Sequence, residues 1–204
     1  PARICNGIDM TKFLKLVATT LTLMTTHFSL AVEINAEEKA LVFDIYKELV
    51  ETNTTNSVGD NTLAAKRVKS RLLAAGFDEG DLFIGGQKTR KGNIVARLRG
   101  TGAKEPMILL AHLDVVEAKP TDWSMDPFTL HQKDGYFYGR GTLDDKAQAA
   151  IWTAIMIRMK TARHRPNRDI ILALTADEEG GGNNGVYWLQ DNHPELIEAA
   201  FALN

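Results

Sequence analysis

The sequence predicts an α/β fold: a three-layer α/β/α sandwich with a mixed, mostly parallel sheet. Two segments, Met107 to Ala111 and Ile170 to Leu174, are continuous apolar runs, as in strands that are covered on both faces. Between them, residues 147–159 carry apolar side chains at helical spacing. A strand, a helix and a second strand in this order indicate a crossover between parallel strands, with helices packed on the sheet.

Shorter patterns predict the other elements of one domain. Residues 36–50 form a helix with Glu37 and Glu38 in its first turn, where the helix dipole favours carboxylates. A second helix follows the cap signal at 59–61 and stops at Gly76. The remaining predicted elements are strands over 82–84 and 93–98, a hairpin around Asp134-Gly135, a helix over 184–191 and a final strand over 200–203.

Residues 10–31 have the layout of a secretory signal peptide. A short basic start from Met10 to Lys15 precedes the apolar stretch LVATTLTLM, and small residues at 29–31 predict cleavage after Ala31. A membrane anchor is the less favoured alternative because the apolar stretch is short and rich in threonine. Residues 1–9 precede the plausible initiator and are expected to be upstream or added sequence. We therefore expect an exported protein, periplasmic or secreted and free of the membrane after cleavage, whose folded part is residues 32–204.

Composition limits the partners and the chemistry. The chain has 24 Lys+Arg against 26 Asp+Glu, so no basic face for nucleic acid is expected. Its one cysteine, Cys5, lies before the predicted cleavage point. Any metal in the mature chain would therefore be held by histidine and carboxylates.

Polar side chains follow both predicted buried strands. His112 and Asp114 come after the first strand, and three adjacent carboxylates at 177–179 come after the second. Functional groups in open α/β sheets gather beyond the carboxyl ends of strands, so these groups are expected at one edge. Adjacent carboxylates repel one another, so such a cluster needs a cation, shared protons or exposure to water. Alone, His-x-Asp is more often an ordinary hydrogen-bonded pair than a metal site.

The segment GRGTLDDK, residues 139–146, brings Asp144 and Asp145 to the start of a helix. By itself this pattern favours a capped helix start. Together with the strand-end groups, it supplies one imidazole and several carboxylates without a thiol. That donor set suits two divalent cations bridged by a carboxylate.

These motifs also resemble a known family. The string AHLDVVEAKPTDWSMDPFTLHQKDGYFYGRGTLDDK, residues 111–146, followed by TADEEGG at 175–181, resembles the dinuclear-zinc metallopeptidase family of glutamate carboxypeptidases, aminoacylases and succinyl-diaminopimelate desuccinylase (clan MH). The resemblance covers about residues 36–204. It implies a zinc-peptidase-like catalytic domain that hydrolyses an amide bond in a peptide, as a carboxypeptidase or dipeptidase does, or in an N-acyl amino acid.

The resemblance also implies roles for single residues. His112 is a terminal ligand of one Zn²⁺, Asp144 bridges both ions and Glu179 is a terminal ligand of the other, with Co²⁺ as an alternative metal. Glu178 corresponds to the general base that activates water, and Asp114 to the residue that orients His112. The peptide bond between Asp144 and Asp145 is expected to be cis.

The chain departs from the family pattern at its end. In the family, a further acidic ligand, a later histidine and a lid or dimerisation domain follow the strand that here runs into Asn204. We therefore expect residues 32–204 to be the amino-terminal part of a truncated catalytic domain, with weak metal binding and no useful turnover alone. A homodimer would need the lid domain.

Two other functions remain open at this point. The chain could be a noncatalytic binding module of the same fold or an inactive fragment, although the presence of Glu178 argues against the loss of the base. A magnesium-dependent phosphatase would also place aspartates at strand ends, but it would need neither the His112 pair nor the adjacent glutamates.

Overall fold

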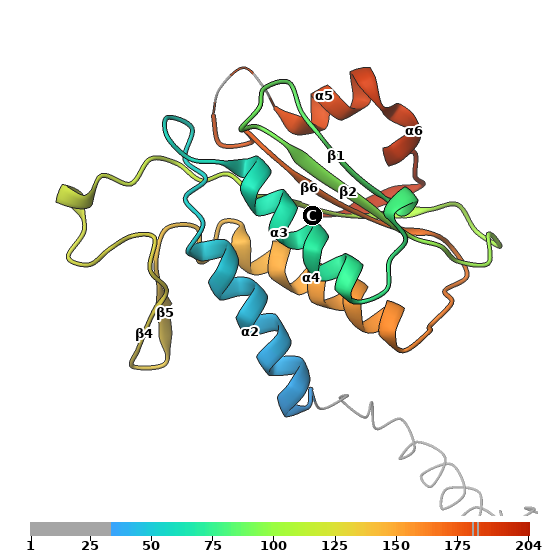
Figure 1. Cartoon of the computed structure of the whole chain (residues 1–204), viewed down its shortest axis with the longest axis horizontal. Helices are drawn as coiled ribbons and strands as arrows, with labels where there is room; N and C mark the ends of the chain where they lie inside the picture. Colours follow the sequence, from blue (N-terminus) through green and yellow to red (C-terminus); the bar gives the residue numbers. More distant parts are fainter. Residues whose placement is uncertain (1–33, 181, 183) are drawn as a thin grey trace, which may run out of the picture. The chain divides into compact units, whose positions relative to one another are not determined.

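The computed structural model describes residues 34–180, 182 and 184–204 (Figure 1). Residues 36–204 form one compact unit. The predicted signal peptide and residues 1–9 lie outside the described residues, so both stay predictions. Among the helices of the described part, none is long and apolar enough to cross a membrane.

A mixed sheet forms the centre of this unit. Its strands within the described residues are β1 (Leu82–Gly85), β2 (Asn93–Leu98), β3 (Met107–His112), β6 (Ile170–Thr175) and β7 (Phe201–Leu203), in the order β1-β2-β6-β3-β7. β3 pairs in parallel with β6 and β7, whereas β2 is antiparallel to β1 and β6. Four strands therefore run in one direction and only β2 is reversed, which confirms the predicted mostly parallel, mixed sheet.

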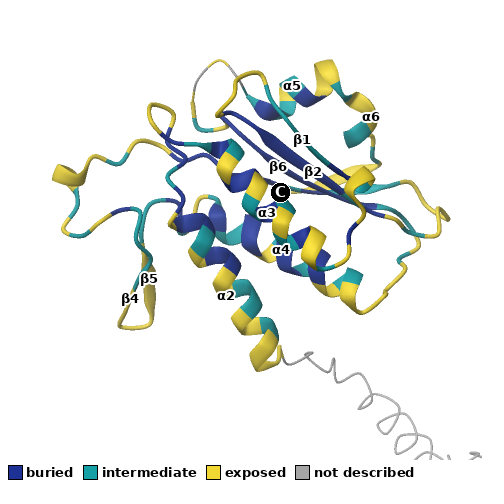
Figure 2. Cartoon of the chain, viewed as in Figure 1, coloured by how far each residue is buried: buried dark blue, intermediate teal, exposed yellow. Residues whose placement is uncertain are grey.

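Helices cover both faces of the sheet (Figure 1). One face carries α2 (Ala36–Val50), α3 (Asn61–Ala74) and α4 (Lys146–Thr161), and the other carries α5 (Gly185–Asn192) and α6 (Pro194–Ile197). Side chains alternate along β6: Leu172 and Leu174 belong to the core under α2 to α4, whereas Ile171 packs with Leu189 of α5. The strands are buried between the two helical layers, as Figure 2 shows. This is the predicted three-layer sandwich.

Local sequence signals explain where several elements begin and end. The Asp60 side chain accepts a hydrogen bond from the backbone N–H of Leu63 and caps α3, and Gly76 beyond the helix has a φ of +93°. Asp134 and Gly135 both have positive φ and form the turn between β4 (His131–Lys133) and β5 (Tyr136–Tyr138). The sequence patterns missed the short helices η1 (Glu79–Asp81), η2 (Pro120–Asp122) and α6.

Candidate metal centre

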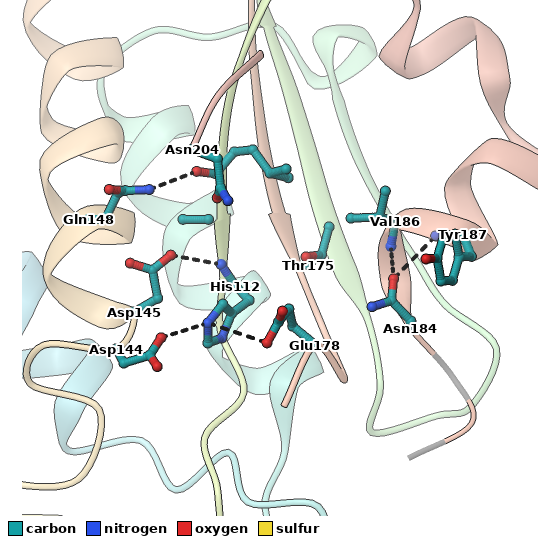
Figure 3. Close-up of a pocket in the computed structure, with 12 residues that line it drawn as sticks. His112, Asp144, Asp145, Gln148, Thr175, Glu178, Asn184, Val186, Tyr187 and Asn204 are labelled. Atoms are coloured by element: carbon teal, nitrogen blue, oxygen red, sulfur yellow. Dashed lines mark hydrogen bonds and ion pairs between the residues drawn. The ribbon is translucent and has the colours of Figure 1, made fainter. Parts of the chain in front are cut away.

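The candidate site lies at the carboxyl edge of β3 and β6. These strands are parallel neighbours, and His112, the last residue of β3, stands opposite Thr175, the last residue of β6. The turn before α4 brings Asp144 and Asp145 to the same edge (Figure 3). The predicted groups from three distant segments therefore meet, as expected for strand ends in an open α/β sheet.

His112 is nearly buried and has an acceptor at each ring nitrogen. Its Nδ1 lies 3.1 Å from the backbone oxygen of Asp114, and its Nε2 lies 2.9 Å from Oδ1 of Asp144. A neutral imidazole has only one N–H, so the second contact needs another proton or a cation. Burial lowers the pKa of His112, but the charges of Asp114, Asp145 and Asp144 and the Asp114 backbone contact outweigh it and leave this pKa raised.

Asp114 connects the histidine to the two glutamates. Its buried carboxylate accepts the backbone N–H of Glu178 at 3.1 Å and that of Glu179 at 3.0 Å. The nearest carboxylate oxygen lies 3.6 Å from Nδ1 of His112, farther than the backbone oxygen of the same residue. Asp114 therefore contacts the imidazole chiefly through its backbone, while its side chain holds the glutamate turn. Its orienting role remains a prediction.

Three potential ligand atoms converge at this edge. The side chains of His112, Asp144 and Glu179 each offer one atom, and these atoms lie within 4.8 Å of one another. Burial, followed by the charge of Asp144, raises the pKa of Glu179, so its ionised form is disfavoured without a compensating cation. Imidazole and carboxylates are the donors that zinc takes in catalytic sites. By donor type and spacing, these residues fit a divalent cation.

Asp145 is turned away from this convergence. The Asp144-Asp145 peptide is cis, as the resemblance implied. The Asp145 carboxylate accepts the backbone N–H of His112 at 3.3 Å (Figure 3) and makes no capping hydrogen bond to α4. Burial raises the pKa of Asp145, and the contact with His112 opposes that shift. Asp145 therefore supports the strand end, and the expectation that this carboxylate caps the helix is wrong.

Glu178 stands beside the ligand atoms with its side chain 55% exposed. Its Oε2 lies 3.9 Å from Nε2 of His112 and faces a cleft of about 550 Å³ (Figure 3). Asn184 and Tyr187 line another part of this cleft. A carboxylate that reaches both solvent and this cleft is able to exchange a proton there.

Two buried lysines near the site had no clear sequence signal. Lys146 is completely buried and donates to the backbone oxygen of Thr52 at 2.8 Å. Burial lowers the pKa of Lys146 to about 7, and the charge of Asp114 opposes the shift. Lys91 pairs with Asp177 at 2.6 Å. Lys146 lies at a predicted helix start and Lys91 between the predicted strands over 82–84 and 93–98, and neither position carries a pattern that indicates burial.

Parts of the chain are similar in sequence to known proteins. Residues 108–204 match the family model of peptidase family M20/M25/M40. The chain is 39% identical over 101 residues to the N-fatty-acyl-amino acid synthase/hydrolase PM20D1 of Xenopus tropicalis and 39% identical over 116 residues to the succinyl-diaminopimelate desuccinylase of Delftia acidovorans. These alignments cover 48% and 56% of the chain but only 20% and 30% of the relatives.

Solved structures share the fold. The M20 family metallo-carboxypeptidase Sso-CP2 from Sulfolobus solfataricus aligns with a TM-score of 0.64 at 18% identity, over 79% of this chain and 36% of that one. Human carnosine dipeptidase 1 aligns with a TM-score of 0.62 at 20% identity, over 83% and 38%. At these identities the likeness shows the fold alone. Residues 108–204 are thus similar in sequence to peptidase family M20/M25/M40, and the chain shares its fold with solved structures of M20 peptidases.

Proposed function

We propose that this chain carries part of the catalytic domain of a metal-dependent hydrolase that cleaves an amide bond in a peptide or an N-acyl amino acid. The observation that carries the proposal is the convergence of His112, Asp144 and Glu179, with Glu178 beside them. The names of the relatives support the substrate class, because they include an N-fatty-acyl-amino acid hydrolase, a desuccinylase and a dipeptidase.

The site would hold two Zn²⁺ ions, with Co²⁺ as an alternative. His112 would bind one ion, Glu179 the other, and Asp144 both, as the family resemblance implies; the donor types and the convergence of these three residues support a divalent cation at this place. When bound, zinc polarises the scissile carbonyl and lowers the pKa of water.

The chain's own residues then orient the groups and move the proton. The Glu178 carboxylate takes a proton from the attacking water and delivers it to the nitrogen of the leaving amine. Asp114 supports this role, since its side chain accepts the Glu178 backbone N–H and fixes the start of that side chain. The acceptors on both sides of the His112 ring hold its plane, so that Nε2 faces Asp144.

We also propose that the protein is exported to the periplasm or the cell exterior. The support is the sequence of residues 10–31, with its basic start, apolar stretch and small residues before the cleavage point. Amino-terminal sequencing of the protein recovered from the source cells would test this: a mature end at residue 32 is expected, and an uncleaved end would contradict it.

Metal binding is the first test of the site. Calorimetric titration with Co²⁺ is expected to show binding that His112→Ala weakens by at least about 100-fold, because a ligand contributes more than the roughly 10- to 100-fold of an outer partner. His164→Ala, at an exposed histidine away from the site, is the matched control and should bind as the wild type does. Equal affinity in the two variants would contradict the assignment.

The reaction class needs a separate assay. The protein expressed from its complete reading frame should hydrolyse dipeptides or N-acyl amino acids, and not phosphate esters. Glu178→Gln should lower kcat by roughly 10²- to 10⁴-fold, the usual contribution of a general base, with Co²⁺ affinity within a few fold of the wild type. Phosphate-ester hydrolysis, or full amidase activity in this variant, would overturn the proposal.

A further inference from the structure

A buried ion pair lies directly behind the glutamate turn. Lys91, in the loop between β1 and β2, places its Nζ 2.6 Å from Oδ1 of Asp177 and 2.9 Å from Oδ1 of Asn56. The two charged side chains are only 9% and 0% exposed. Asp177 immediately precedes Glu178, so this pair lies one residue from the base.

We propose that Lys91 is a positioning residue, which through Asp177 holds the 177–179 turn so that Glu178 and Glu179 face the metal centre. The inference rests on the proposed function for its purpose, but the contacts that carry it are independent of any bound ion.

The backbone of the turn shows why it needs such a support. Asp177 has a φ of +58°, in the left-handed region that few residues other than glycine adopt and in which Asp and Asn are the commonest exceptions. After this residue, the N–H groups of Glu178 and Glu179 both point at the Asp114 carboxylate. Two contacts thus hold the turn: the Asp177 side chain pairs with Lys91, and the backbone N–H groups of the two glutamates donate to Asp114.

Lys91 itself belongs to a firmly attached loop. Its backbone N–H donates to the backbone oxygen of Lys88 at 2.9 Å, and the backbone N–H of the next residue, Gly92, donates to the Thr62 hydroxyl at 2.8 Å. The oxygen of Arg90 accepts the N–H of Asn61 at 2.9 Å, at the start of α3. Because this loop is hydrogen-bonded to α3, the position of Lys91 relative to the site is fixed by the loop and by α3.

The competing explanation is that the pair only completes the core. Buried ion pairs are often replaceable by apolar side chains with no loss of stability, whereas removal of one partner leaves a costly lone charge. A positioning role instead predicts that loss of the pair lowers the local order of the glutamate turn even when the overall fold is stable. The experiment must therefore read local order and global stability separately.

Amide hydrogen exchange provides the local readout. In the metal-free protein, Lys91→Met should speed exchange at the Glu178 and Glu179 amides by about tenfold, as expected when a hydrogen bond to a charged group no longer restrains a turn. Exchange at Leu172, in the middle of β6, should stay within about twofold. Lys88→Met is the matched control, because it removes the same charge from an exposed position of the same loop. Equal exchange in both variants would overturn the proposal.

A double variant separates positioning from the burial of a lone charge. Asp177→Asn keeps a residue that tolerates positive φ, and Lys91→Met with Asp177→Asn removes both charges. Positioning by the pair predicts that exchange at Glu178 and Glu179 stays fast in the double variant although its resistance to urea recovers. If exchange returns to the wild-type rate together with stability, the pair is only structural and the proposal is wrong.

Co²⁺ supplies a second, independent readout. Lys91→Met should weaken Co²⁺ binding by about tenfold, the lower range for an outer partner of a ligand, and alter the visible absorption of the bound ion. Lys88→Met should do neither. If the wild type binds no Co²⁺ through His112, the proposed function fails, while amide exchange still decides the role of Lys91.

Discussion

The two edges of the central sheet place aspartates and glutamates in opposite electrostatic settings. At the carboxyl edge of β6, Asp144, Asp145 and Glu179 gather around one histidine. At the amino edge, Asp169 accepts hydrogen bonds from Arg97 at 3.2 Å and from the backbone N–H of Gly100 at 2.8 Å. Because β2 runs opposite to β6, the end of β2 brings these donors to the start of β6.

The pKa shifts differ in the same way. Burial is the largest influence on Asp145 and Glu179, and it raises the pKa of both. Burial acts in the same direction on Asp169, but the Gly100 N–H and the Arg97 guanidinium outweigh it and lower this pKa. Arginine is always charged, whereas the compensating group at the other edge is His112, whose charge depends on pH. The charges at the amino edge are therefore neutralised at every pH at which the arginine is charged, whereas the carboxyl edge is suited to an added cation.

The largest expected effect on stability is at the permanently neutralised edge. Asp169→Asn should lower the free energy of unfolding by about 1–2 kcal/mol at pH 7. The substitution removes the charge of the partly exposed carboxylate that accepts hydrogen bonds from Arg97 and Gly100. Urea denaturation would measure the loss. Asp191→Asn, at an exposed position of α5, should change it by less than about 0.5 kcal/mol.

The pH dependence fixes the sign of this effect. A carboxylate whose pKa is lowered by folding stabilises the fold above its unfolded pKa and loses that contribution as pH falls through the folded value. The difference between wild type and Asp169→Asn should therefore shrink as the pH is lowered below about 4. A difference that is constant down to pH 2 would show that the carboxylate charge is not responsible.

At the carboxyl edge, replacing a carboxylate by an amide should raise the stability of the metal-free protein instead of lowering it. Glu179→Gln should raise the stability of the metal-free protein by about 0.5 kcal/mol at pH 7, since it removes a half-buried charge that lies near Asp144. A carboxylate with a raised pKa destabilises the fold above the folded value, so the gain should vanish below the unfolded value of about 4.3. Thermal unfolding in EDTA is the measurement.

Added metal should reverse the ranking of these two proteins. With excess Co²⁺, wild type should gain more in Tm than Glu179→Gln, because a ligand that binds only the folded state stabilises it by mass action. Glu105→Gln, at an exposed position outside the site, should follow wild type in both conditions. If Glu179→Gln destabilises the protein in EDTA, the buried charge of Glu179 does not lower the stability of the metal-free fold.

The smallest effect is expected for an exposed ion pair at the amino edge. Arg99 donates to Oδ1 of Asp81 at 2.9 and 2.7 Å, but its side chain is 66% exposed. Arg99→Gln should lower the free energy of unfolding by at most about 0.5 kcal/mol, and roughly 0.5 M NaCl should abolish the difference. A loss as large as that for Asp169→Asn would mean that exposure does not separate the two pairs.

Local patterns in the sequence predicted the layers, the parallel pair of buried strands and the types of side chain that converge at the ends of those strands. Burial on one face or on two imposes a local periodicity, so the apolar runs predicted β3 and β6 and the helical spacing predicted α4. The ends of those strands then predicted where His112 and Glu179 would lie, and the motif around Asp144 supplied the third group that converges with them. These features depend on residues close together in the chain.

Local patterns did not predict how these groups are held in place. The Asp145 carboxylate accepts the backbone N–H of His112, and the Asp114 carboxylate accepts the backbone N–H groups of both glutamates. Both contacts depend on which strands lie side by side. Lys91 and Asp177 are 86 residues apart, and neither position carries a pattern that marks a buried pair. Local periodicity reports which face of an element is buried, but the pairing of charges between distant segments is set by topology and by the low polarity of the space that they share.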